Sequence, residues 1–138
     1  MIDTTNPEFL KTITSVYFSC GGFFGGYSDV TVEKTDNGAM INVIPSIFIR
    51  SDITETNKQL SIDEWQSFIN AVFTKYRLGE WNKEYVDHGV LDGTQWEIKI
   101  KLNSGNELEY RGSNAYPRNW VEFIDYINDL IAFSGVRY

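Results

Sequence analysis

His88 and Cys20 are the side chains best suited to do chemistry, and the sequence contains one residue of each type. Asp87 precedes His88 and Asp92 follows it closely, so the imidazole could act as a general base or a metal ligand oriented by a carboxylate. A zinc site needs further His or Cys ligands, which the sequence lacks. The alternative is a loop histidine beside a turn, because Asp residues commonly hydrogen-bond the backbone there.

Cys20 would need His88 beside it and an oxyanion hole to act as a nucleophile. The neighbouring glycines could present backbone amides, but nothing in the sequence fixes that geometry. The alternative is a buried, unreactive thiol. The glycines of the adjacent stretch 21–26 do not open a helix and lack the Gly-Lys-Ser/Thr ending of a phosphate-binding loop. We therefore predict no catalytic residue, no metal site, no cofactor and no enzymatic activity. An enzyme built on His88 and nearby carboxylates is the third-ranked alternative.

Two groups of residues are candidates for contact with a partner. Phe23 and Phe24 lie between pairs of glycines, just before Tyr27. The glycines either allow a tight strand connection whose rings cap the core, or form a pliable tip whose rings contact another protein. The second group, in the last predicted helix, is acidic and spaced by three and four residues: Glu122, Asp125 and Asp129. It can be a docking face for a basic partner, an oxygen-rich metal site or a solvated helix side.

Length and charge restrict the class of protein. The chain has 138 residues, which fits one domain over 1–138, and its formal net charge is −7. Nucleic acids and anionic membranes attract clustered cations, so we expect neither as a partner. No apolar run approaches the ~18 residues of a membrane span, and the first residues do not resemble a signal peptide. A single cysteine fits a reducing compartment, and we expect a cytoplasmic location.

The first half of the sequence predicts strands. Residues 12–18 are β-prone, and residues 27–34 alternate apolar and polar side chains. Asn37-Gly38 predicts a hairpin turn, which places Val32 opposite Val43. Pro45 suggests an edge or a strand end, and residues 47–49 can continue that strand.

A second hairpin is predicted around residues 103–105, with Gly105 in the left-handed position. In this register each outward-facing pair joins opposite charges: Lys101–Glu107, Lys99–Glu109 and Glu97–Arg111. The inward-facing pairs are apolar: Ile100–Leu108 and Ile98–Tyr110. A register that satisfies both faces at once is strongly specified.

Two helices complete the predicted fold. Ser61 and Glu64 have capping-box spacing at the start of a helix over about 62–77, which Gly79 ends. Pro117 begins a second helix over about 117–133, with Gly135 as its stop. We predict an α+β fold: an antiparallel sheet of about five strands, with both helices packed on one face. Trp65, Trp81, Trp96 and Trp120 are spread over separate elements, which favours core positions.

Two stretches resemble a family of small bacterial proteins of unknown function. The first is the glycine–aromatic opening Phe18-Ser19-Cys20-Gly21-Gly22-Phe23-Phe24-Gly25-Gly26-Tyr27. The second is the ending Gly112-Ser113-Asn114-Ala115-Tyr116-Pro117-Arg118-Asn119-Trp120, similar to a Gly-x-Asn-x-Tyr-Pro-x-Asn-Trp pattern. The resemblance spans roughly residues 17–131. It implies a stand-alone bacterial domain and no particular activity.

We therefore expect a non-enzymatic protein-interaction domain, such as an immunity or inhibitor protein that occludes a basic partner. Its predicted partner-binding residues are Phe23, Phe24, Tyr27, Glu122, Asp125 and Asp129. The alternative is a domain that binds a small ligand or a peptide in a cleft near the 80–94 linker. Its predicted cleft residues are Tyr85, His88 and Tyr116.

Overall fold

A computed structural model describes residues 3–22, 26–46, 56–89 and 93–138. The strands of this part are β1 (Ile13–Gly22), β2 (Gly26–Thr35), β3 (Gly38–Ile44), β4 (Thr56–Ser61), β5 (Glu84–Val86), β6 (Thr94–Leu102) and β7 (Glu107–Ser113). The α-helices are α1 (Pro7–Leu10), α2 (Ile62–Asn70) and α3 (Trp120–Leu130). Shorter helical segments are η1 (Ala71–Lys75), η2 (Leu78–Glu80) and η3 (Ala132–Ser134).

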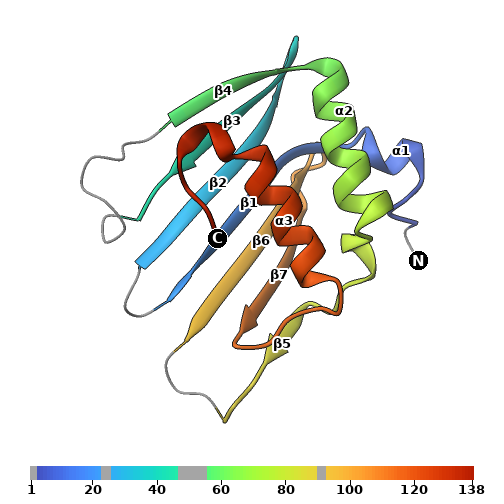
Figure 1. Cartoon of the computed structure of the whole chain (residues 1–138). Coiled ribbons are helices and arrows are strands. Elements are labelled where there is room, and N and C mark those ends of the chain that lie inside the picture. The colour runs from blue at the N-terminus through green and yellow to red at the C-terminus, as the bar shows by residue number, and fades with distance from the viewer. Residues whose placement is uncertain (1–2, 23–25, 47–55, 90–92) are drawn as a thin grey trace.

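The strands form one sheet with the order β4-β3-β2-β1-β6-β7-β5, in which only β5 and β7 pair in parallel. Helices α2 and α3 lie across one face of this sheet, as Figure 1 shows. The predicted α+β class is therefore confirmed. The described part of the chain contains no helix with the length and apolar character of a membrane span.

The number of strands was predicted wrongly, because the described residues form a sheet of seven strands rather than about five. The additional strands are β4 and β5, one at each edge. Only Leu60 of β4 is buried, so the sequence of this edge strand has little apolar pattern. β5 has only three residues, too few to show an alternation.

The hairpin of β6 and β7 has the predicted register. Lys101 pairs with Glu107, and Lys99 with Glu109. Gly105 has the positive φ, 91°, that the short connection requires. Glu97 lies opposite Arg111 in the same ladder. The opposite-sign pairs lie on the face of the sheet that the helices leave open, which we call the helix-free face.

The hairpin of β2 and β3 differs from the prediction by two residues. Thr35 pairs with Gly38, and Val30 rather than Val32 lies opposite Val43. A shift of two preserves the faces, so both valines remain buried in the core. A Cβ at Gly38 would lie 2.0 Å from the carbonyl oxygen of Leu60 in β4. The glycine therefore allows close strand approach and does not form the turn.

The first long helix begins as predicted and ends differently. The Ser61 hydroxyl accepts from the Glu64 amide, and the Glu64 carboxylate accepts from the Ser61 amide. The helix widens into the π-helical segment η1, and Arg77 rather than Gly79 has left-handed backbone, with φ 51°. Gly79 is needed for packing instead, because a Cβ there would overlap the Thr4 side chain.

The last helix is shorter than the predicted 117–133: α3 begins at Trp120, after a turn at residues 118–119, and ends at Leu130. Gly135, the predicted stop, has left-handed backbone with φ 81°, but it caps the short segment η3, whereas α3 itself ends at Leu130.

Candidate functional site

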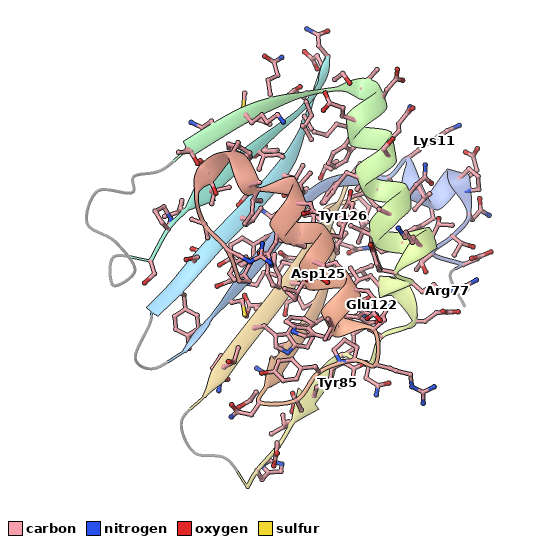
Figure 2. All side chains as sticks on the ribbon, in the orientation of Figure 1. Lys11, Arg77, Tyr85, Glu122, Asp125 and Tyr126 are labelled. Atoms are coloured by element: carbon pink, nitrogen blue, oxygen red, sulfur yellow. The ribbon has the colours of Figure 1, made fainter. Side chains whose placement is uncertain are left out.

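Three carboxylates line the side of α3 that faces away from the sheet, and we call this group the acidic α3 surface: Glu122, Asp125 and Asp129. All three residues are exposed. Figure 2 shows Glu122 and Asp125 on the outer side of the helix, and Tyr126 toward α2, where it contacts Phe68. Within the described part of the chain, none of the three carboxylates has an ion pair or a side-chain hydrogen bond.

Exposed apolar side chains flank the acidic α3 surface. Val121 is 67% exposed, and Phe133 in η3 is 39% exposed. The Lys58 ammonium lies 5.7 Å from the centre of the Phe133 ring, a cation–π contact. This side of the molecule therefore combines unpaired negative charge with apolar area.

The predicted partner-binding residues do not form one surface. Tyr27 projects from β2 on the helix-free face, because its neighbour Ser28 is buried on the helix side. The acidic α3 surface lies on the opposite face of the sheet. Phe23 and Phe24 lie outside the described residues, so their predicted contact stays a prediction.

The predicted cleft residues Tyr85 and Tyr116 lie at opposite ends of a continuous stack of aromatic rings. Tyr85 packs on Trp96 with ring centres 5.9 Å apart, Trp96 on Trp120 at 4.7 Å, and Trp120 on Tyr116 at 5.2 Å. The two indoles fill the space between the tyrosines. Ring packing thus explains the tyrosine positions without a cleft between them.

His88 lies apart from this stack. It is exposed on a turn in which the Gly89 amide donates to the Asp87 carboxylate at 2.9 Å. Its other predicted neighbour, Asp92, lies outside the described residues. The described geometry is that of a loop histidine beside an Asp turn.

A groove lies beside the 80–94 linker, but on the helix-free face, and we call it the sheet-face groove. Its volume is about 400 Å³. Strand alternation directs Glu84 and Val86 of β5 into it and Tyr85 to the other side. Sequence analysis missed this site because β5 was not predicted. The alternating charges of residues 95–101 and 107–111 were the available signal.

The floor and the walls of the sheet-face groove differ in character. The floor contains Ser19, Gln95 and Ser113, and the Gln95 amide donates to the Ser113 hydroxyl at 2.8 Å. Tyr27 and Val86 supply exposed apolar side chains at its margins. Small and polar residues at the centre of a sheet thus leave a hollow between larger ones.

Charged residues of the sheet-face groove are paired with one another or with a neighbour. Arg111 donates to one carboxylate oxygen of Glu84 through Nη2 at 2.8 Å and Nε at 3.1 Å. The Lys99 ammonium lies 3.3 Å from a carboxylate oxygen of Glu97. Hydrogen bonding to Glu84 raises the pKa of Arg111, so this guanidinium stays charged.

The two stretches that carry the family resemblance meet in space. A shallow groove near the C-terminus is lined by residues of both stretches, including Gly21, Gly22, Tyr116 and Trp120. Several motif positions have packing roles. A Cβ at Gly112 would lie 2.0 Å from Nε1 of Trp96, and the Asn119 amide donates to the Tyr76 carbonyl at 2.7 Å.

Cys20 faces the helix side of the sheet, and its burial raises the pKa of its thiol to about 11. At neutral pH the thiol is therefore protonated and weakly nucleophilic. Among the described residues, no group of three or more His, Cys, Asp and Glu side chains is placed to hold a metal ion.

We expect iodoacetamide to alkylate Cys20 at pH 8 about 100-fold more slowly in the folded protein than in the urea-unfolded chain. The reason is that raising the pKa of the thiol from 9.0 to about 11 lowers the thiolate fraction at pH 8 about 100-fold. Mass spectrometry over a pH series measures this rate, which should keep rising until about pH 11. A plateau near pH 9 would contradict the buried, protonated thiol.

The chain was compared with family models and with curated proteins. No family model matches it, and no curated protein is significantly similar to it.

Proposed function

We propose that the protein is a non-enzymatic interaction domain that occludes a basic protein partner, as an immunity or inhibitor protein does. The observation that carries this proposal is the acidic α3 surface, whose three exposed carboxylates have no partner within the described residues. The formal net charge of −7 also attracts a basic partner.

Unpaired like charges give this surface its preference for cations. Carboxylates spaced by three and four residues repel one another by tenths of a kcal/mol, so they slightly destabilise the free helix. A partner that brings Lys or Arg side chains relieves this repulsion and forms charge-assisted hydrogen bonds. Long-range attraction also accelerates encounter, by a factor of about 10–1,000 in steered complexes.

Apolar contact is the second requirement of a stable complex, since exposed ion pairs alone contribute about 0–1 kcal/mol each. Val121 supplies exposed apolar area beside Glu122 in α3, and Phe133 is exposed in η3, four residues after Asp129. A partner that covers them gains burial energy in addition to electrostatic steering.

The experiment is a kinetic binding measurement with a purified basic candidate, such as the product of the neighbouring gene. We expect Glu122→Lys combined with Asp125→Lys to lower the association rate constant about tenfold or more, because the steering charge is reversed where the partner docks. Raising the salt from about 50 to about 300 mM should weaken the wild-type complex.

A matched control separates local charge from net charge. Glu33→Lys combined with Asp36→Lys raises the formal net charge from −7 to −3, as the α3 pair does, but on exposed residues of β2 and the following turn. We expect this control to have a clearly smaller effect on the rate. Equal effects of the two pairs, or binding that does not depend on salt, would overturn the docking site on α3.

Small-ligand binding is a second candidate function, and the sheet-face groove favours it. The groove lies next to the 80–94 linker, has a volume of about 400 Å³, and combines hydrogen-bonding groups with exposed apolar walls. These are the features of ligand sites in general.

A further inference from the structure

We propose that the sheet-face groove binds a neutral polyhydroxylated ligand of the saccharide class. This inference rests on the small-ligand function proposed above and names its ligand class. It depends on the charge balance of the groove, on its hydrogen-bonding groups and on the exposed ring of Tyr27.

The charge balance disfavours a charged ligand. The charged residues that line the groove are Glu84, Glu97 and Arg111. Arg111 pairs with Glu84, and Lys99, which lies outside the lining, pairs with Glu97, so the formal charges of the two pairs cancel. An ionic ligand gains little net attraction from these residues, because each charge is already balanced by its partner. The acidic α3 surface is the opposite case, because its carboxylates are unpaired and attract cations.

The same pairs leave hydrogen-bonding capacity directed at the groove. Both bonds from Arg111 end on one oxygen of Glu84, so the second oxygen remains an acceptor, and the guanidinium retains further N–H donors. The Gln95 amide uses one donor for Ser113 and retains its carbonyl. The groove therefore offers both donors and acceptors to a ligand.

Neighbouring hydroxyls of a sugar can use both kinds of group, because each hydroxyl both donates and accepts. Planar groups such as a carboxylate or a guanidinium can bond two adjacent oxygens at once. A neutral polyol can therefore use the groove without disrupting the ion pairs that shape it.

The ring of Tyr27 supplies the apolar component. It is 50% exposed at the margin of the groove, whose opposite margin contains Val86. A sugar ring presents C–H groups on its faces, and these pack on an aromatic surface while its hydroxyls reach the polar floor. Since the groove is open to solvent, we expect affinity in the millimolar range.

The test uses amide NMR titration of the full chain with three neutral disaccharides: cellobiose, maltose and N,N′-diacetylchitobiose. Spermidine and citrate are the cationic and anionic comparisons. We expect at least one disaccharide to shift the amide signals of Gln95, Glu97 and Ser113 saturably, with little change between about 50 and about 300 mM salt. Tyr27→Ala should weaken this binding about tenfold.

Tyr116→Ala is the matched control, because this tyrosine has similar exposure, 41%, and lies on the other side of the sheet. It should leave disaccharide binding unchanged, as should Asp125→Lys on α3. Equal losses from the two tyrosine variants would overturn the assigned site. Spermidine or citrate binding in the groove without disaccharide binding would overturn the saccharide class but keep the small-ligand function. No binding by any probe would overturn both.

Discussion

Replacement of Trp96 by alanine is expected to lower the free energy of unfolding by about 3–5 kcal/mol, a large share of the stability of a domain of this size. Trp96 is 2% exposed and contacts Trp81, Tyr85 and Trp120. Its Nε1 also donates to the Ala115 carbonyl at 3.0 Å, so the variant loses both packing and a hydrogen bond. Urea unfolding followed by far-ultraviolet circular dichroism measures the change.

Tyr116→Ala is the control for this prediction, because the Tyr116 ring forms the exposed end of the same stack. We expect it to cost about 1 kcal/mol or less. Comparable losses from the two variants would contradict the assignment of Trp96 to the centre of the core.

Asn128→Ala is expected to destabilise the protein by about 2–4 kcal/mol, because Asn128 holds the C-terminal residue in place. Its amide donates to the Tyr138 carbonyl at 3.1 Å, and its carbonyl accepts from the Tyr138 amide at 2.7 Å. The Tyr138 hydroxyl then donates to the Ser28 carbonyl at 2.6 Å, which ties the end of the chain to β2. Asn128 is 4% exposed, so alanine would leave the partners of its side chain without hydrogen bonds.

Urea unfolding tests this prediction, with Asp129→Ala as the control on an adjacent exposed residue. Hydrogen exchange at the Tyr138 amide gives a local measurement, and exchange there should accelerate in Asn128→Ala. A loss below about 0.5 kcal/mol would contradict the structural role of this contact.

Alkaline pH should lower the stability of the folded protein through the Tyr138 hydroxyl. Burial raises the pKa of Tyr138 above its ordinary value of 10.0. Above pH 10 the unfolded chain has released this proton while the folded chain retains it, so the unfolded state binds fewer protons and stability falls as the pH rises. Below pH 10 the protonated Tyr138 hydroxyl makes its full contribution to stability. In Tyr138→Phe, the free energy of unfolding should fall less steeply above pH 10. The variant also removes the hydrogen bond to Ser28.

Local sequence patterns were sufficient to predict much of the fold. The β6–β7 register could be predicted because the charge pairs on one face and the apolar pairs on the other require the same alignment. The capping box of Ser61 and Glu64 depends on residues three apart, so it could also be recognised in the sequence.

Glycine roles were harder to predict, because they depend on what approaches from elsewhere in the chain. Gly38 is next to a turn signal, but its lack of a side chain serves the neighbouring strand β4. Gly79 is similarly close to Thr4 near the N-terminus. In both cases the deciding contact comes from a segment that the local pattern does not include.

The sequence by itself determined the α+β class, the net negative charge, the exposed acidic positions on the last helix and the pairing of the charged hairpin. These properties follow from composition and from spacings within single elements or hairpins. Only the tertiary structure decided that three tryptophans stack together, that Tyr27 and the acidic α3 surface lie on opposite faces, and that β5 borders a groove. The physical reason is that each of these features joins segments far apart in the chain, and their contacts are selected by the packing of the whole core.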